Sequence, residues 1–196
     1  MGRIAGVTPE ETRERLLGAA ARVFELKGFE GATVSLIASE AGVSSGAIYA
    51  HYGSKAELLV DALSAHREQV TASLFPAGSP VRATDILLTL ANRLGDRDRP
   101  DSNLLAESLL GARRDPELAK VLADSLTDRQ ADMAEIIAEG QQAGQLSDDV
   151  SATAASRFAL MLGLGAMLVR QLDMEPVDPS DWSTFTNRLL AAFTEE

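Results

Sequence analysis

The spacing of hydrophobic residues along this 196-residue chain predicts helices throughout. Apolar positions recur every three to four residues over long stretches, and no stretch keeps the apolar–polar alternation of a half-buried strand. No Asn-Gly hairpin turn occurs. The pattern therefore indicates an all-α protein.

Capping and breaking residues divide the first 75 residues into four predicted helices. A Ser or Thr precedes each one, where its side chain can accept a hydrogen bond from the first free backbone N–H groups. Gly28 and Gly42 end the first and second helices, and Pro76 stops the fourth. The predicted helices cover residues 9–27, 34–41, 45–51 and 55–75.

Five further helices are predicted beyond residue 80. The pairs Asp115-Pro116 and Asp178-Pro179 open the third and the last of them, because aspartate caps a helix and proline suits its first position. A polar loop is expected from Asp96 to Pro100. The predicted helices cover residues 81–95, 102–113, 116–143, 150–172 and 180–194.

Composition excludes several classes of protein. The chain has no cysteine, which excludes disulfides and thiolate metal sites and favours a reducing compartment. Two histidines leave little material for a metal centre, so we expect no metal and no cofactor. No signal peptide is recognisable, and the longest apolar run, residues 158–169, is too short to span a bilayer. We expect a soluble cytoplasmic protein with no membrane partner.

The distribution of charge suggests two parts with different partners. A net charge of −11 over the whole chain argues against a nucleic-acid partner, because DNA repels an acidic body. However, residues 1–55 hold 6 Lys+Arg and 6 Asp+Glu, whereas residues 56–196 hold 12 and 23. A neutral head on an acidic body indicates two domains, 1–55 and 56–196.

The segment from Thr33 to Leu59 has the pattern of a DNA-binding helix-turn-helix. Two short predicted helices are separated by a tight turn, Gly42-Val43-Ser44. Apolar side chains fall where the helices would cross, at Ile37, Ala38, Ala41, Val43 and Ile48. Small or polar side chains fall on the face that would enter a groove, at Ser44, Ser45, Gly46 and Ala47.

This segment resembles the DNA-binding head of the tetracycline-repressor (TetR/AcrR) family. The resemblance spans about residues 8–60 and rests on motifs in chain order. They are Gly28-Phe29, Thr33, then Ile37, Ala38, Ala41, Gly42, Val43 and Ser44, then Gly46, Tyr49, His51 and Tyr52, then Ser54, Lys55, Leu58 and Leu59. The rest of the chain matches the family in length and helical pattern only.

The resemblance implies roles for individual residues of the head. Phosphate contacts would come from Thr33, Tyr49 and Lys55, and contacts with bases or sugars from Ser35, Ser45, Gly46, Ala47 and His51, with Ser44 on the same face. One departure matters, because position 45 is often Lys or Arg in the family and is Ser here. No Arg or Asn projects from the recognition helix for two-bond base contacts. We expect specificity to rest on Ser and His contacts, close approach at glycine, and DNA shape.

The resemblance also implies a homodimer with a ligand-binding body. The helices at about 150–172 and 180–194 would form a four-helix interface, and the apolar face of the first is larger than a monomer usually exposes. A small-molecule effector in the body would shift the 55–75 helix and change the separation of the two heads. Candidate effector contacts are His66, Met133, Phe158 and Met161, although ordinary core positions explain all four better.

The hypothesis is therefore a repressor that binds a palindromic double-stranded DNA operator as a dimer and is released by an effector. The alternative is a DNA-binding regulator or nucleoid-type protein without a ligand, whose body only dimerises. A hollow of roughly 300–1,000 Å³ inside the body would favour sensing. An enzyme is not expected. The stretch from Gly42 to Gly46 matches the Gly-x-Ser-x-Gly elbow of serine hydrolases, but that motif needs a preceding strand, and a helix is predicted there.

Overall fold

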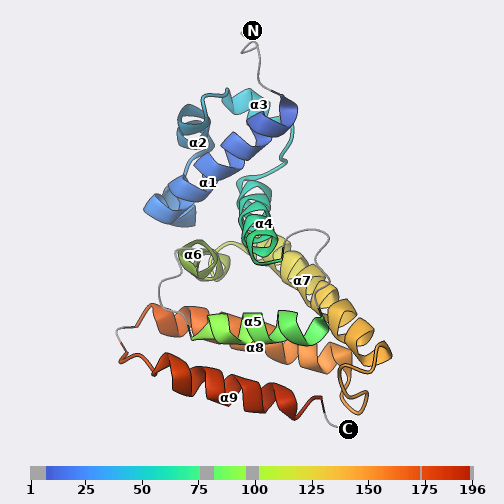
Figure 1. The fold of residues 1–196 in the computed structure, drawn as a ribbon. Coiled ribbons are helices and arrows are strands. Elements are labelled where there is room, and N and C mark those ends of the chain that lie inside the picture. Colours follow the sequence, from blue (N-terminus) through green and yellow to red (C-terminus); the bar gives the residue numbers. More distant parts are fainter. Residues whose placement is uncertain (1–7, 76–81, 96–101, 173, 195–196) are drawn as a thin grey trace. The chain divides into compact units, whose positions relative to one another are not determined.

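The computed structural model describes residues 8–75, 82–95, 102–172 and 174–194 (Figure 1). Within these ranges all regular elements are helices, which confirms the predicted all-α class. They are α1 (Pro9–Gly31), α2 (Val34–Ala41), α3 (Ser45–Tyr49), α4 (Lys55–Leu74), α5 (Ala83–Leu94), α6 (Ser102–Ala112), α7 (Pro116–Gln142), α8 (Ala152–Arg170) and α9 (Pro179–Ala191). The predicted stop at Pro76 and the predicted loop from Asp96 to Pro100 lie outside the described residues.

The predicted and observed helix boundaries differ by at most four residues, and the largest difference is at the end of α1. Gly28 does not end this helix as predicted. It adopts φ 67° and ψ 174°, which kinks the helix, and helical backbone resumes as far as Gly31. The kink turns Phe29 into the core, where it is 7% exposed and stacks on Phe24.

Contacts along the chain define two compact units. The head unit comprises residues 1–76 and 103–125, and the body unit comprises residues 77–102 and 126–196. The division passes through α7, and contacts group α4 and most of α6 with the head. The functional boundary at residue 55 stays a prediction, since compactness does not test it.

The core of the head unit forms where α1 packs against α2 and α4. Its capping residues hold the helix starts as predicted. Thr8 Oγ1 accepts a hydrogen bond from Glu11 N at 3.1 Å, and Thr8 N donates to Glu11 Oε2 at 2.8 Å, completing the capping box. Fully buried apolar side chains from the three helices include Phe24, Ile37, Leu58 and Leu59.

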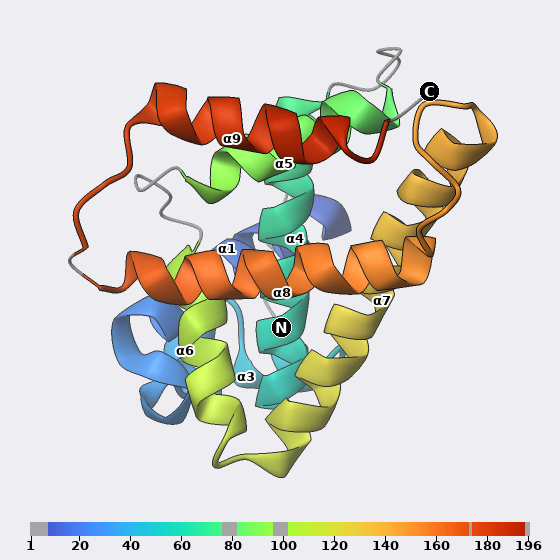
Figure 2. The same ribbon diagram turned by 90° about the horizontal axis from the view of Figure 1, so that it is seen from below.

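The body unit is built around α5, which packs against α8 and α9 (Figure 2). Polar contacts fix the α5–α9 pair. Trp182 Nε1 donates to Ala91 O at 3.1 Å, and the Thr186 hydroxyl lies 2.7 Å from Asn92 Oδ1. The buried apolar cluster described here is small, formed by Ala83, Ile137 and Leu146 with half-buried neighbours.

Helix α8 exposes much of its apolar surface. Phe158 is 53% exposed and Met161 is 63% exposed. By length and composition this 19-residue helix could cross a membrane, and little of it is buried. The expectation that the apolar segment is too short to span counted only the run from 158 to 169, and it stays a prediction. A helix used in a protein interface passes the same test.

Candidate nucleic-acid interface

The turn between α2 and α3 has the tight geometry that a helix-turn-helix needs. Gly42 lies in the left-handed region, with φ 68° and ψ 32°, which a glycine adopts without steric cost. Val43 N donates to Ala38 O at 2.9 Å, which closes the end of α2. A Cβ at Gly42 would also lie 3.1 Å from a nitrogen of the Arg15 guanidinium, so space as well as conformation favours glycine here.

Helix α3 is anchored by one side and exposed on the other. Ile48 is 1% exposed and packs into the core of the head unit. Ser44 Oγ accepts a hydrogen bond from Ala47 N at 3.1 Å and caps the helix. Because α2 and not a strand precedes Ser44, the Gly-x-Ser-x-Gly stretch lacks the setting of a hydrolase nucleophile.

The residues predicted to face DNA lie on or beside α2 and α3, with Lys55 at the start of α4, and Figure 1 shows α2 and α3 next to one another in the head unit. Tyr49 is 59% exposed, whereas Tyr52 is half-buried, so Tyr52 is the packed aromatic of the pair. The exposed members of the predicted set are Thr33, Ser35, Ser44, Gly46, Ala47, Tyr49 and His51, and the half-buried ones are Ser45 and Lys55.

Two hydroxyl groups lie at the start of α2. Thr33 Oγ1 accepts a hydrogen bond from Leu36 N at 3.2 Å and lies 3.1 Å from Ser35 Oγ. Both side chains are exposed. This arrangement places hydroxyls beside the positive end of the helix dipole, a setting that suits an anion such as a phosphate.

Lys55 differs from its expected environment. Its ammonium donates to Phe29 O at 2.5 Å and to Ala32 O at 3.0 Å, and it lies 4.2 Å from the centre of the Phe29 ring. Burial lowers the pKa of Lys55, against the opposing attraction of Asp115 and Glu30. The sequence suggested a free positive charge here, but the group instead caps carbonyls at the end of α1. Contact of Lys55 with a phosphate stays a prediction, and the third N–H of the ammonium is the donor that the two carbonyls leave for it.

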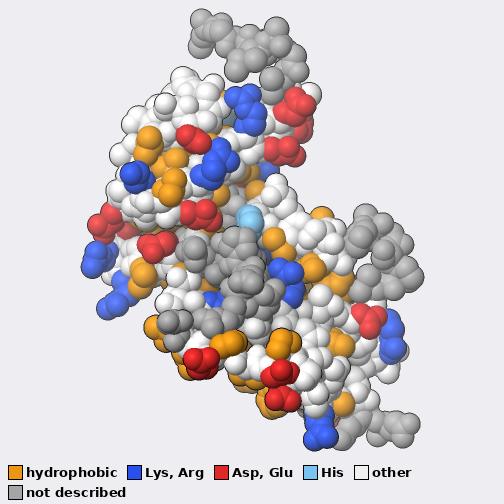
Figure 3. Space-filling model, turned by 60° about the vertical axis from the view of Figure 1, so that its left-hand side comes forward, with side chains coloured by type: hydrophobic (Ala, Val, Ile, Leu, Met, Phe, Trp, Pro, Cys, Tyr) orange, Lys and Arg blue, Asp and Glu red, His pale blue; other side chains and the backbone are white. Residues whose placement is uncertain are grey.

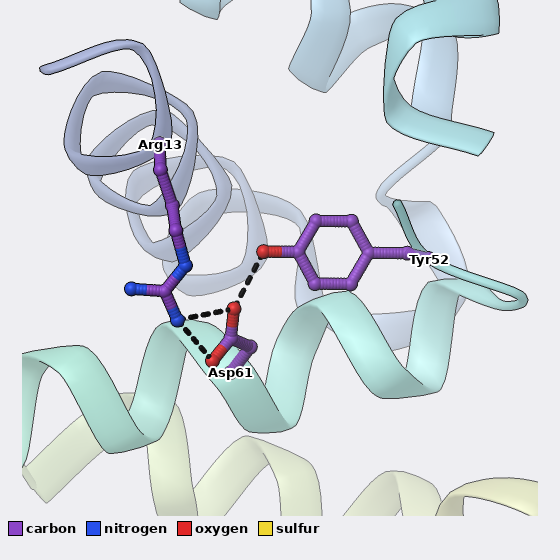
Figure 4. Close-up of polar contacts among 3 residues, drawn as sticks. All are labelled: Arg13, Tyr52 and Asp61. Atoms are coloured by element: carbon purple, nitrogen blue, oxygen red, sulfur yellow. Dashed lines mark hydrogen bonds and ion pairs between the residues drawn. The ribbon is translucent and has the colours of Figure 1, made fainter. Parts of the chain in front are cut away.

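A cluster of Arg13, Tyr52 and Asp61 was not predicted from the sequence (Figure 4). One nitrogen of the Arg13 guanidinium lies 2.7 Å and 2.8 Å from the two Asp61 oxygens, and the Tyr52 hydroxyl donates to Asp61 Oδ2 at 2.5 Å. Burial and the bond to Asp61 raise the pKa of Tyr52 to about 12. The cluster ties α4 to α1 and to the segment that follows α3. Separations of 9 and 48 residues gave no sequence signal for it.

On the face drawn in Figure 3, the described basic side chains of the head unit do not form a continuous patch. Arg22 pairs with Glu40 at 3.3 Å, and Arg15 donates to Ala41 O at 2.8 Å. On the face drawn in Figure 3, acidic and basic side chains are interspersed. DNA binding by this head would therefore depend on local contacts more than on an extended positive surface.

The candidate effector contacts have unlike environments. His66 is half-buried and its Nε2 has no hydrogen-bond partner among the described residues, and Met133 packs against the small cluster of the body unit. Phe158 and Met161 lie on the exposed face of α8 and line no described cavity. The structure does not bring the four residues together within one unit.

A cleft of about 450 Å³ lies in the head unit between the end of α1 and the end of α6. Charged side chains dominate its walls, and Arg114 pairs with Glu30 across 3.6 Å. The walls are residues 27–30 with Glu107, Leu110, Gly111, Arg113 and Arg114. By the predicted boundary its walls come from both the head (27–30) and the body (107–114), so it is not a hollow enclosed by the body alone.

Comparisons with known proteins find similarity to one family of regulators. The sequence profile of "Bacterial regulatory proteins, tetR family" matches residues 16–62. The chain is 25% identical to the HTH-type transcriptional regulator UidR of Escherichia coli (strain K12), over 93% of this chain and 91% of UidR. It is 37% identical over 76 residues to the regulator SrpR of Pseudomonas putida, covering 39% of this chain and 36% of SrpR. The crystal structure of a TetR-family regulator from Rhodococcus sp. has the same fold, with a TM-score of 0.78 and 21% identity over 95% of this chain and all of that one. The family profile, the curated relatives and the solved structures together support a TetR-family, DNA-binding transcriptional regulator.

Proposed function

We propose that this regulator is a dimeric repressor that binds a palindromic operator through α3 and is released by a small molecule. The observation that carries the DNA-binding surface is the segment from Ser44 to His51. It is exposed along its outer side while Ile48 fixes its inner side in the core. A recognition helix needs this combination, because its exposed side enters the groove while its buried side keeps it fixed to the rest of the head unit. The phosphate and base contacts named above are proposed on the same grounds.

The proposed dimer interface is the apolar face of α8 and α9. A monomer gains nothing by exposing so many large apolar side chains, and a second copy would bury them. Side chains more than a third exposed are Phe158, Met161, Leu162, Leu168, Val169, Phe185 and Leu189. A Cβ built at Gly163 or Gly165 meets nothing within 4 Å, so this chain's own packing does not require those glycines. They would let the helices of a second copy approach closely.

Release by an effector is proposed from relatives. A regulator from Saccharomonospora viridis was solved in complex with choline, and FadR from Bacillus subtilis in complex with stearoyl-CoA. Each is 20% identical to this chain with a TM-score of 0.64. A ligand can act only by binding one spacing of the two heads more tightly than another. The cluster on Asp61 supports this route, since it would carry a movement of α4 to α1 and α3.

The alternative is a regulator whose body only dimerises and which has no effector. The regulator with an effector and the regulator without one would both act by binding DNA. We therefore propose a cytoplasmic location and no catalytic activity for either. The two forms differ in one measurement, the operator affinity with and without candidate ligands. Affinity that no ligand changes would favour the alternative.

Selection of bound fragments from a random duplex pool tests the proposed function. The expected product is a sequence with two inverted half-sites about one helical turn apart, occupied by two chains. Specific DNA should bind at least about 10³-fold more tightly than unselected DNA at the same salt concentration. A pool that never enriches, or one that enriches a single site bound by one chain, would contradict the proposal.

A further inference from the structure

The surface exposed by the helix-turn-helix has no side chain able to make a two-bond contact with a base. Residues 33–53 contain no Arg, Lys, Asn or Gln. The one carboxylate in this range, Glu40, pairs with Arg22. Proteins usually recognise guanine through Arg or Lys, and adenine through Asn or Gln. This segment must therefore recognise bases by other contacts.

Gly46 is a glycine that this chain's own structure does not require. Its φ is not positive, unlike those of Gly28, Gly42 and Gly144. A Cβ built at Gly46 would meet nothing closer than Ser44 Oγ, at 3.9 Å. Glycine inside a helix costs about 1 kcal/mol relative to alanine. The missing side chain instead leaves the exposed backbone of α3 open to a partner that approaches closely.

Ala47 presents a methyl group beside this open backbone. The residue is exposed, and the bond from its N–H to Ser44 Oγ holds it in the first turn of α3. The first turn of a recognition helix is the part that contacts base edges. In the major groove thymine carries the C5-methyl group, and alanine is among the side chains that contact it.

We propose that Gly46 and Ala47 contact thymine methyl groups in the major groove, so that thymines and not guanines specify each operator half-site. This inference rests on the proposed function, that α3 binds DNA. The backbone at Gly46 provides the close approach, and the Ala47 methyl provides the apolar surface. Single hydrogen bonds from neighbouring hydroxyl groups and the shape of the groove complete the recognition.

The DNA side of the test removes one methyl group at a time. Each thymine of a selected operator is replaced by deoxyuridine, which keeps base pairing, and affinity is measured at fixed salt by fluorescence anisotropy. At one or two thymines per half-site we expect a loss of about fourfold, the value for burying one methyl group. Replacing each guanine by 7-deazaguanine is the matched control and should leave affinity unchanged. Equal affinity for all deoxyuridine operators, or a large loss with 7-deazaguanine, would overturn the inference.

The protein side uses Ala47→Gly and Gly46→Ala. With Ala47→Gly, the loss on deoxyuridine substitution should shrink to less than about twofold at the contacted thymine, because the protein methyl is gone. Gly46→Ala should keep the thermal stability of the wild type but bind the operator at least about tenfold more weakly. Matched controls are Ala131→Gly, on the exposed surface of α7, and Gly18→Ala, whose added Cβ would lie 3.6 Å from an Arg22 nitrogen. Both should bind as the wild type does.

The outcomes separate this inference from the proposed function. Tight operator binding that no deoxyuridine substitution weakens would keep the proposed function and refute the thymine contact. Full deoxyuridine sensitivity in the Ala47→Gly variant would place the methyl contact elsewhere on the protein. Failure to enrich any operator would count against the proposed function itself.

Discussion

Replacing Lys55 by methionine separates its structural role from its predicted role on DNA. The substitution keeps most of the apolar stem but removes the ammonium that bonds to Phe29 O and Ala32 O. Hydrogen bonds that involve a charged group contribute about 1.5–3 kcal/mol each. Since Lys55 is half-buried, we take the lower part of that range for the two bonds together and expect a loss of about 1.5–2 kcal/mol.

Urea unfolding of the Lys55→Met variant, followed by circular dichroism at one protein concentration, measures this loss. Lys27→Met is the matched control, because Lys27 is exposed and no hydrogen bond or ion pair to it is described. It should change the free energy of unfolding by less than about 0.5 kcal/mol. A Lys55→Met variant as stable as the wild type would refute the capping role.

Salt titration of operator binding tests the second role of Lys55. A phosphate contact contributes about 0.9 to the slope of log affinity against log salt concentration. If Lys55 only caps carbonyls, the folded Lys55→Met variant keeps the wild-type slope. A slope reduced by about 1 would show that the ammonium also contacts a phosphate when DNA binds.

Three further predictions concern the turn, the Asp61 cluster and the proposed interface. Gly42→Ala should destabilise the chain by about 1–2 kcal/mol in urea unfolding, because φ is +68° there, and unchanged stability would contradict the turn geometry. The environment that raises the pKa of Tyr52 contributes its full stability below pH 10, and this contribution disappears as pH rises from 10 to about 12. Tyr52→Phe should therefore reduce the fall in the free energy of unfolding between pH 10 and 12, and an unchanged fall would exclude Tyr52 as its cause. Phe158→Asp should convert the dimer to monomer in light scattering, and an intact dimer would place the interface elsewhere.

Local signals predicted the helices well because they act within a few residues. Thr8, Thr33, Ser44 and Ser54 each accept a hydrogen bond from a backbone N–H three residues later, as their positions before apolar runs indicated. The exposure of α3 also followed from its short apolar pattern, in which Ile48 is the buried member. Such features need no knowledge of distant parts of the chain.

Features that depend on distant partners escaped the sequence reasoning. Lys55 looked like a free cation because nothing near it in sequence marks carbonyls 23 and 26 residues earlier as acceptors. A kink at Gly28, which a helix-ending glycine did not suggest, directly precedes the segment that carries those carbonyls. The sequence also did not determine what covers the apolar face of α8, since such a face can pack against a core, a second copy or a membrane.

The central claim, that the exposed face of α3 is the DNA-recognition surface, is tested most directly by Ala47→Glu. The fold leaves Ala47 exposed, so the carboxylate should not change stability, but it would oppose the phosphates and fill the groove. We predict operator binding weakened at least about 100-fold, with Ala131→Glu on α7 binding as the wild type. Wild-type affinity in a correctly folded Ala47→Glu variant would contradict the account.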